Sequence, residues 1–144
     1  MKSVAEILRS KAHALVYSVA PDDSVLAAVT LMAEKGIGAL VVLNNGHLVG
    51  IVSERDYARK VALLERSAFA AKVSEIMTAD VITVGPRHTT KDCMQLMTDR
   101  HLRHLPVLAE GELIGLLSIG DLVKQTIAEQ ESLIQQLEQY IRGE

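Results

Sequence analysis

The chain has 144 residues, 49% of them hydrophobic, and a formal net charge of −3 at pH 7. This length allows one compact domain, or two small domains that share a core. The slightly acidic charge and the lack of tryptophan argue against nucleic-acid binding, which uses basic faces and aromatic stacking platforms. The single cysteine, Cys93, excludes an internal disulfide.

Nothing in the sequence predicts export or insertion into a membrane. The first six residues include Lys2 and Glu6 where a signal peptide needs an apolar run, and no stretch reaches the ~20 apolar residues of a membrane span. We therefore expect a cytoplasmic protein without membrane contacts.

The first half of the chain predicts alternating helices and strands. Apolar residues recur at helical spacing between Val25 and Met32, so we expect a helix over residues 25–35 that ends at Gly36. Asp23 or Ser24 would cap its start. The other expected elements of this half are a short helix over 1–8, a strand over 16–19, a hairpin of strands 39–43 and 48–52 with its turn at Asn44-Asn45-Gly46, and a helix from Ser53 to about residue 65.

The second half repeats this order of elements and adds a long final helix. The expected elements are a short helix over 73–77, a strand over 81–84, a helix over 90–100, a hairpin of strands 105–108 and 112–117 with its turn at Glu110-Gly111, and a helix from Ile119 to about Arg142.

The two halves are copies of one unit. Shifted by 65 residues, Gly50–Asp56 falls on Gly115–Asp121, and with a shift of 69 Val4–Leu8 falls on Val73–Met77. We expect an α+β fold of two β-α-β-β-α repeats that pack through their sheets about a pseudo-twofold axis. The expected boundaries are 1–70 for the first repeat, 71–128 for the second and 129–144 for a C-terminal helical extension.

Each copy places a serine and an aspartate three residues apart at the start of a helix, as Ser53 and Asp56 and as Ser118 and Asp121. A helix start offers N–H groups and a positive dipole end to a phosphate, and a carboxylate accepts hydrogen bonds from a pair of ribose hydroxyls. The same spacing also makes a capping box, which needs no ligand. The recurrence of Ser and Asp in both copies favours the nucleotide interpretation.

These residues resemble a tandem pair of CBS domains, the cystathionine β-synthase repeat, also called a Bateman module. The resemblance covers about residues 2–128. The chain is most similar to the small free-standing bacterial members of the family. The segments that carry it are Val19-x-Pro21, Leu40-Val41-Val42, Gly50–Asp56, Val84-x-Pro86, Arg103–Val107 and Gly115–Asp121.

The resemblance implies binding of an adenosine ligand (AMP, ADP, ATP, S-adenosylmethionine or NAD(H)) in two clefts between the repeats. In each cleft the aspartate takes the ribose hydroxyls, the serine approaches the phosphate, and the base lies against the short helix and the middle strand. One cleft would use Asp121, Ser118, Leu116, Arg103, His104, Ser3, Ile7, Leu8, Ile37, Gly38 and Ala39. The other would use Asp56, Ser53, Ile51, Lys72, Ile76, Met77, Leu102, Arg103 and His104.

The two clefts differ in charge. The second copy has Arg103-His104 where the first has Gly38-Ala39, whereas the first copy has cations at its helix start, among them Arg55 and Lys60. This difference predicts that the clefts differ in affinity or in preferred ligand. Gly36 and Gly38 leave room for a larger ligand, so we expect NAD(H) in one cleft and a mononucleotide in the other.

Metal binding and catalysis find little support. No Cys or carboxylate cluster joins the histidines at metal-ligand spacing; His101 fits a helix end, and His104 fits either a ligand contact or a structural strand position. The remaining histidines are His13, His47 and His88. Cys93 is expected in the core, and no nucleophile–base arrangement is visible, so we expect neither an enzyme nor a metal site.

The last helix carries a stripe of residues at heptad spacing. This stripe could pack back on its own module or pair with the same helix of a second subunit, and the length beyond Gln130 favours a homodimer. The stripe consists of Val123, Ile127, Gln130, Ile134, Leu137 and Ile141.

The sequence therefore predicts a regulatory sensor of adenine nucleotides, active in energy sensing and signal transduction through an unidentified regulated protein. The alternative is a dimerising adaptor whose clefts are vestigial.

Overall fold

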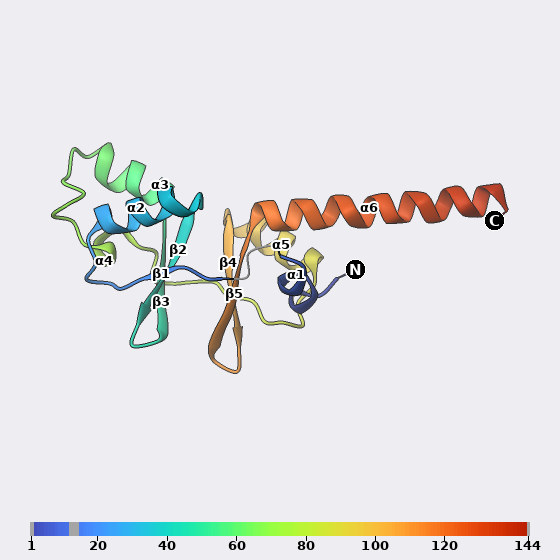
Figure 1. Ribbon diagram of the computed structural model, residues 1–144, viewed down its shortest axis with the longest axis horizontal. Coiled ribbons are helices and arrows are strands. Elements are labelled where there is room, and N and C mark those ends of the chain that lie inside the picture. Colours follow the sequence, from blue (N-terminus) through green and yellow to red (C-terminus); the bar gives the residue numbers. More distant parts are fainter. Residues whose placement is uncertain (1, 12–14, 144) are drawn as a thin grey trace. The chain divides into compact units, whose positions relative to one another are not determined.

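The computed structural model describes residues 2–11 and 15–143 and confirms the α+β class. The contacts divide the chain into two compact units. Unit 1 consists of residues 1–14, 83–109 and 114–144, and unit 2 consists of residues 15–82 and 110–113. Figure 1 shows the helices and strands of both units.

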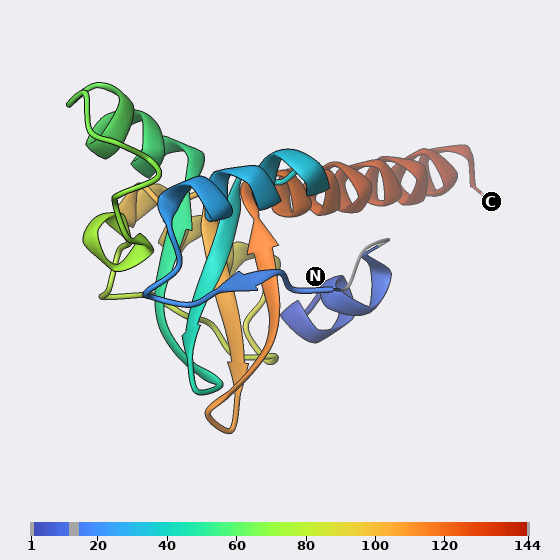
Figure 2. The ribbon, with the colours of Figure 1, turned by 60° about the vertical axis from the view of Figure 1, so that its left-hand side comes forward.

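Unit 2 is built on a three-stranded sheet with the order β1-β2-β3. Strands β1 (Ser18–Val19) and β2 (Ala39–Asn44) are parallel, and β2 forms an antiparallel hairpin with β3 (His47–Ser53). Helix α2 (Val25–Lys35) crosses one face of this sheet (Figure 2).

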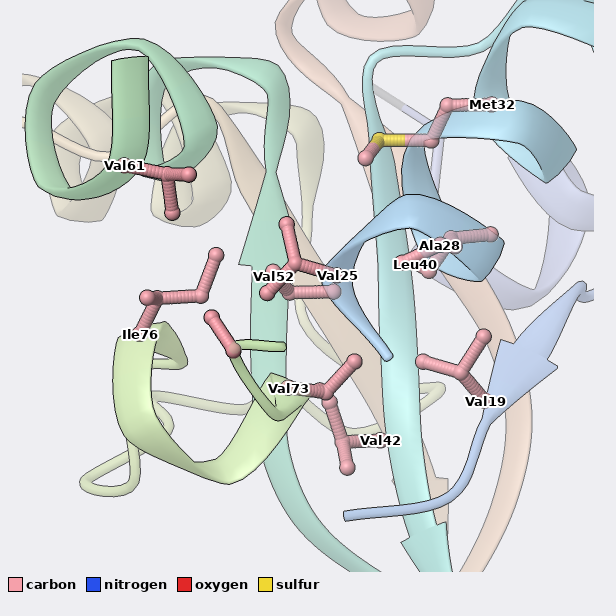
Figure 3. Packing of buried hydrophobic residues seen from close by; sticks show 11 residues of the cluster. Val19, Val25, Ala28, Met32, Leu40, Val42, Val52, Val61, Val73 and Ile76 are labelled. Atoms are coloured by element: carbon pink, nitrogen blue, oxygen red, sulfur yellow. The ribbon is translucent and has the colours of Figure 1, made fainter. Parts of the chain in front are cut away.

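The core of unit 2 lies between that face of the sheet and α2. Val25, Ala28 and Met32 of the helix are at most 1% exposed, as the spacing of its apolar residues predicts. They pack with Leu40 and Val42 of β2 in one cluster (Figure 3). The buried stripe therefore fixes which face of α2 meets the sheet.

The local signals around α2 and the hairpin are confirmed. The Ser24 hydroxyl accepts the Ala27 N–H at 3.0 Å at the start of α2, and Gly36 ends the helix in the left-handed conformation at φ 64°. Asn45 and Gly46 make the turn with φ values of 51° and 82°. These residues stop one element and begin the next without help from distant parts of the chain.

The helix expected to continue to residue 65 is not a uniform α-helix. After Ser53 the chain forms α3 (Glu54–Tyr57) and then a π-helical turn, η1 (Ala58–Ala62). The wider turn is closed by the Leu63 N–H, which donates to the Ala58 carbonyl at 3.0 Å. It leaves Val61 only 1% exposed, packed in the unit 2 core.

Unit 1 holds a two-stranded sheet and most of the helical residues. Its parts are α1 (Val4–Ser10), α5 (Thr90–Arg100), β4 (His104–Ala109), β5 (Glu112–Ser118) and α6 (Ile119–Arg142), although the tip of the β4–β5 hairpin clusters with unit 2. Helix α6 has 24 residues and runs well past α5 (Figure 1). Among the described residues, no helix is both long and apolar enough to span a membrane.

The strand expected over residues 81–84 is wrong. Only Val84 pairs there, in a single parallel bridge with Val107. The repeat sets Pro106 where Val41 stands in the first copy, and proline has no N–H to donate to a neighbouring strand. The ladder that gives β1 its second residue therefore cannot form here.

The short helices α1 and α4 (Val73–Ile76) each pack on the other copy of the repeat. The Val4 N–H donates to the His88 carbonyl at 2.7 Å in unit 1, and the Val73 N–H donates to the Asp23 carbonyl at 2.9 Å in unit 2. Each unit thus combines the body of one copy with the short helix of the other. The boundaries expected from the repeat (1–70, 71–128 and 129–144) describe copies of sequence and stay a prediction.

Glycines in β3 and β5 make this exchange sterically possible. A Cβ at Gly50 would lie 2.5 Å from the Met77 sulfur and 3.0 Å from the Thr78 carbonyl oxygen. A Cβ at Gly115 would lie 2.6 Å from a methyl group of Leu8. The lack of a side chain at each glycine lets the segment of α4 or α1 lie directly against the strand.

We expect Gly50→Ala to lower the free energy of unfolding by about 1–3 kcal/mol, because the Thr78 backbone cannot move aside without disturbing its pairing with Ile51. Gly115→Ala should cost less, since the Leu8 side chain can rotate. Chemical denaturation checks both. Gly38→Ala is the control, because a Cβ there meets no atom within 4 Å, and an unchanged Gly50→Ala protein would contradict the packing.

Candidate functional site

The two Ser-x-x-Asp segments both form capping boxes. In unit 2 the Ser53 hydroxyl accepts the Asp56 N–H at 3.2 Å, and Asp56 Oδ2 accepts the Ser53 N–H at 2.9 Å. In unit 1 the matching distances for Ser118 and Asp121 are 3.1 Å and 2.8 Å. The capping interpretation is therefore confirmed for both helix starts.

A third capping box, at the start of α5, shows what capping alone requires. Thr89 and Asp92 make the same pair of hydrogen bonds at 3.2 Å and 2.9 Å. Asp92 is exposed, whereas the side chains of Asp56 and Asp121 are only 16% and 23% exposed. Burial of the carboxylate is thus a property of the two Ser-x-x-Asp segments and not of helix capping in general.

Each of these helix starts is also tied to the beginning of the neighbouring strand. The Glu54 N–H donates to the Gly38 carbonyl at 3.0 Å, just before β2. The Ile119 N–H donates to the Arg103 carbonyl at 2.8 Å, just before β4. Gly38 and Arg103 are equivalent in the repeat, so both units hold the carboxylate beside the same part of a strand.

A lysine ammonium lies on each half-buried carboxylate. Lys11, which follows α1, is 2.9 Å from Asp121 Oδ2 and donates to the Leu116 carbonyl at 2.8 Å. Lys60, in the π-helical turn, is 3.3 Å from Asp56 Oδ1 and donates to the Ile76 carbonyl at 2.8 Å. Each ammonium therefore joins a carboxylate to a backbone oxygen.

These contacts set the ionisation of Asp121. Burial opposes its negative charge, but the Ser118 N–H and the Lys11 ammonium stabilise the carboxylate more strongly, so the pKa of Asp121 lies below its ordinary value of 3.8. The group is fully ionised at neutral pH and can act as a hydrogen-bond acceptor for hydroxyl groups.

His104 lies close to this carboxylate in unit 1. Burial lowers the pKa of His104 below its ordinary value of 6.5, and this effect outweighs the attraction of Asp121. The imidazole is thus largely uncharged at neutral pH. Its role toward a ligand would be that of a hydrogen-bonding group, while Arg103 beside it carries the permanent charge.

The structure places the other predicted residues in two groups. Unit 1 holds Ser3 as the N-cap of α1, Ile7 in its core and Leu8 against Gly115. The predicted residues of unit 1 are Ser3, Ile7, Leu8, Leu102, Arg103, His104, Leu116, Ser118 and Asp121. The predicted residues of unit 2 are Ile37, Gly38, Ala39, Ile51, Ser53, Arg55, Asp56, Lys72, Ile76 and Met77.

In unit 2, Ile76 is linked to Asp56 through Lys60. Ile51 pairs with Thr78 through two backbone hydrogen bonds of 3.0 and 2.9 Å, and Ile76 supplies the carbonyl that Lys60 contacts. Lys72 instead lies at the surface, 3.7 Å from Asp22. Each cleft expected from the sequence combines residues of both units. Unit 1 contains the residues expected around Asp121 except Ile37, Gly38 and Ala39, which belong to unit 2.

Lys11 is the residue that sequence reasoning missed. It is separated from Asp121 by 110 positions of chain, and no repeat signal marks it. Lys60 carries a local signal, because it stands four residues after Asp56 on the same helix. Sequence proximity to a Ser-x-x-Asp segment therefore identifies Lys60 but not Lys11.

The remaining side chains with reactive chemistry have structural positions. Cys93 is fully buried, and burial raises the pKa of its thiol to about 11, as expected for a core residue. His101 ends α5 in the left-handed conformation at φ 55°. His13 lies outside the described residues, and among those described no group of three or more His, Cys, Asp or Glu residues could hold a metal ion.

Helix α6 leaves its apolar stripe exposed. Val123, Ile127, Ile134 and Leu137 are 43–54% exposed, and Ile141 is 81% exposed. Leu122 and Gln125, on another side of the helix, are buried in the chain. The alternative in which the stripe packs back on its own module is wrong.

Comparison with known proteins identifies the family. The CBS domain family model matches residues 4–63 and 73–127, so the chain belongs to the CBS domain family and carries two tandem copies. It is 39% identical to the CBS domain-containing protein CBSX3, mitochondrial, of Arabidopsis thaliana, over 98% of this chain and 72% of that protein. It is 30% identical to the CBS domain-containing protein YhcV of Bacillus subtilis, over 85% and 84% of the two chains.

Solved structures agree with this assignment. A candidate signal-transduction protein with CBS domains from Burkholderia ambifaria is 56% identical, with a TM-score of 0.86 over 90% of this chain and 96% of that one. A CBS-domain protein from Agrobacterium tumefaciens is 36% identical, with a TM-score of 0.82 over 87% and 99%. The match to an inosine-5'-monophosphate dehydrogenase of Korarchaeum cryptofilum covers only 21% of that enzyme.

We expect the stability contributed by Asp121 to disappear in acid. Because its pKa is lowered in the folded chain, the contribution is present above about pH 4 and is lost as the pH falls through the folded pKa. Asp121→Asn should cost about 1 kcal/mol at neutral pH, and this cost should shrink toward zero once the pH falls below the pKa of Asp121 in the folded chain.

Thermal unfolding of both proteins across this range measures the difference. Asp80→Asn is the control, since Asp80 is exposed. A cost that stays constant down to the lowest pH would contradict the assigned ion pair.

Proposed function

We propose that this CBS-domain chain is a regulatory sensor that binds adenosine nucleotides through Asp56 and Asp121. The observation that carries the proposal is that these two capping carboxylates are largely buried and paired with lysines, whereas the capping carboxylate of Asp92 is exposed. A carboxylate that is kept ionised and partly shielded from water binds a pair of hydroxyl groups well.

The cations near each carboxylate favour a phosphorylated ligand. In unit 1 Lys11 pairs with Asp121, and Arg103 adjoins His104. In unit 2 Lys60 pairs with Asp56, and Arg55 directly precedes that aspartate. Because these cations come from different positions of the repeat, the two carboxylates are expected to differ in affinity. We propose AMP, ADP or ATP as ligands, with NAD(H) at one of the two positions.

A structural neighbour supports an adenosine moiety in the ligand. The CBS domain pair of protein MJ0100 was solved in complex with 5'-methylthioadenosine and S-adenosyl-L-methionine, and this chain matches it with a TM-score of 0.77 at 22% identity. That likeness extends to the fold alone. The choice of a phosphorylated ligand for this chain rests on its own cations.

Sensing requires that the ligand bind one conformation of the chain better than others. A regulated protein, not identified by the chain itself, would read the favoured conformation. The cytoplasm, where adenine nucleotides are made and consumed, is the proposed compartment. No catalytic step is part of this proposal.

We expect AMP, ATP or NADH to raise the melting temperature of the wild-type protein. Asp121→Ala and Asp56→Ala should each remove one binding event, with a loss of at least about tenfold in affinity, because the acceptor of the ribose hydroxyls is gone. Isothermal titration calorimetry measures both.

Asp92→Ala is the matched control, since it removes the same group from a capping box without a lysine. It should lower stability without changing nucleotide affinity. Equal nucleotide affinity in all three variants would refute the site, and no binding by the wild-type protein would favour the adaptor.

The chain is further proposed to form a homodimer through α6. The exposed stripe of Val123, Ile127, Ile134, Leu137 and Ile141 follows heptad spacing, which the same helix of a second copy can match. A CBS-CP12 protein from bloom-forming cyanobacteria, 27% identical, is hexameric in its solved structure. A dimeric sensor and a dimeric adaptor without ligands share this feature.

We expect Ile134→Glu to convert the dimer into a monomer, because a charge in the stripe would be desolvated on pairing. Light scattering coupled to gel filtration measures the mass. Gln139→Glu places the same charge on the opposite side of α6 and should leave the dimer intact. A wild-type protein that is monomeric at all concentrations would rule out this pairing.

A further inference from the structure

The lysines on Asp56 and Asp121 are not equivalent residues of the repeat. Lys11 follows α1, whereas Lys60 lies in the π-helical turn after α3. The repeat sets Gln125 at the position that matches Lys60, and Lys11 lies in the segment, residues 9–18, where the first copy has four residues more than the second. Two unrelated positions in the sequence therefore bring an ammonium to the same carboxylate of the repeated unit.

Helix capping does not account for these lysines. The capping box of Thr89 and Asp92 has the same hydrogen bonds, and within residues 2–11 and 15–143 no lysine or arginine forms an ion pair with Asp92. The capping carboxylate of α4, Glu75, pairs with Arg66, but its side chain is 46% exposed. A lysine paired with a mostly buried capping carboxylate is found at Asp56 and Asp121, to which the proposed function assigns the ribose.

The backbone carbonyl that Lys11 contacts has a different partner in the other copy of the repeat. The Ile51 carbonyl in unit 2 accepts the Thr78 N–H at 2.9 Å, whereas the equivalent Leu116 carbonyl in unit 1 accepts the Lys11 ammonium. Lys11 thus holds a position that a backbone group fills in the other unit. An ammonium on a flexible side chain can leave such a position, which a paired backbone cannot do without local unfolding.

The carboxylate oxygens that the lysines contact are the groups that a ribose would need. On Asp56 the Ser53 N–H and hydroxyl both lie on Oδ2, and Lys60 lies on Oδ1. On Asp121 the Ser118 N–H and Lys11 both lie on Oδ2. A diol that approaches either carboxylate must share it with the ammonium or displace the ammonium.

Displacement leaves a cation that needs a new partner. The Lys11 side chain is 24% exposed, so water only partly compensates its charge once the carboxylate is taken. A ligand that carries a phosphate supplies the missing anion, whereas an uncharged nucleoside does not. The exchange therefore costs little for a nucleotide and much for a nucleoside.

We propose that Lys11 and Lys60 are exchangeable counterions, which release Asp121 and Asp56 to the ribose and pair with the ligand's phosphate. This inference rests on the proposed function and adds the selection of phosphorylated over uncharged adenosine ligands. Lys11 has the larger effect, because its ion pair is shorter than that of Lys60 and its side chain is less exposed than the 45% of Lys60.

The test compares AMP with adenosine at one carboxylate at a time. In an Asp56→Ala background, which leaves the Asp121 position intact, calorimetry should show AMP binding at least about tenfold more tightly than adenosine. Adding Lys11→Met should reduce this ratio by about tenfold, with weaker AMP binding and unchanged or tighter adenosine binding. Lys60→Met in an Asp121→Ala background should reduce it by a smaller factor.

Lys11→Arg, which keeps the charge, should preserve the ratio, and Lys91→Met, on the exposed side of α5, should leave it unchanged. If Lys11→Met unfolds, Lys11→Gln replaces it: this variant removes the charge and should reduce the ratio, whereas Lys11→Arg keeps the charge and the ratio.

An AMP-to-adenosine affinity ratio that Lys11→Met leaves intact would overturn the inference alone; if both affinities fall by the same factor, Lys11 has a structural role. If the wild-type protein binds neither ligand, the proposed function fails together with it.

Discussion

A carboxylate that both caps a helix and holds an ammonium is the constraint on which the rest of this structure depends. Asp56 and Asp121 accept a serine N–H at the start of α3 and α6, and each has a lysine at 3.3 or 2.9 Å. Burial of an ionised carboxylate is unfavourable unless hydrogen bonds and a counterion compensate it. Both kinds of partner are present at each position, so a charged acceptor can be kept partly shielded from water.

The duplication places this arrangement twice, and the exchange of short helices links the copies. Helix α1 completes the unit that contains Asp121, and α4 completes the unit that contains Asp56. Gly50 and Gly115 are the residues that let these helices lie against the strands. One consequence is that neither copy of the repeat has all of its contacts within its own sequence, which favours the folding of the pair as a whole.

Local signals made much of the fold predictable. Ser24 and Gly36 delimit α2, and the turn residues Asn45 and Gly46 delimit the first hairpin, because each acts through its own backbone and its nearest neighbours. The strand over residues 81–84 was wrong because Pro106, 22 positions after Val84 in the chain, removes a donor from its partner strand. The π-helical turn was also not predicted, because hydrophobic periodicity does not show that Val61 is buried through a widened turn.

Some features of the candidate site could likewise be predicted from local sequence, and others could not. The two serine–aspartate pairs could be found from spacing and duplication, and their capping geometry follows from the helix starts themselves. The neutral state of His104 and the contact between Lys11 and Asp121 depend on residues brought together only by the fold. The same holds for the exposure of the α6 stripe, since heptad spacing cannot tell which other surface covers it.

The central claim is that the carboxylates of Asp56 and Asp121 meet an adenosine nucleotide while other capping carboxylates do not. The most direct measurement is the side-chain carboxyl ¹³C NMR spectrum of the aspartate-labelled protein, recorded as AMP is added. We expect the resonances of Asp56 and Asp121 to move and to saturate while that of Asp92 stays in place. Saturating AMP that leaves all three unchanged, or that moves Asp92 as much as the others, would contradict it.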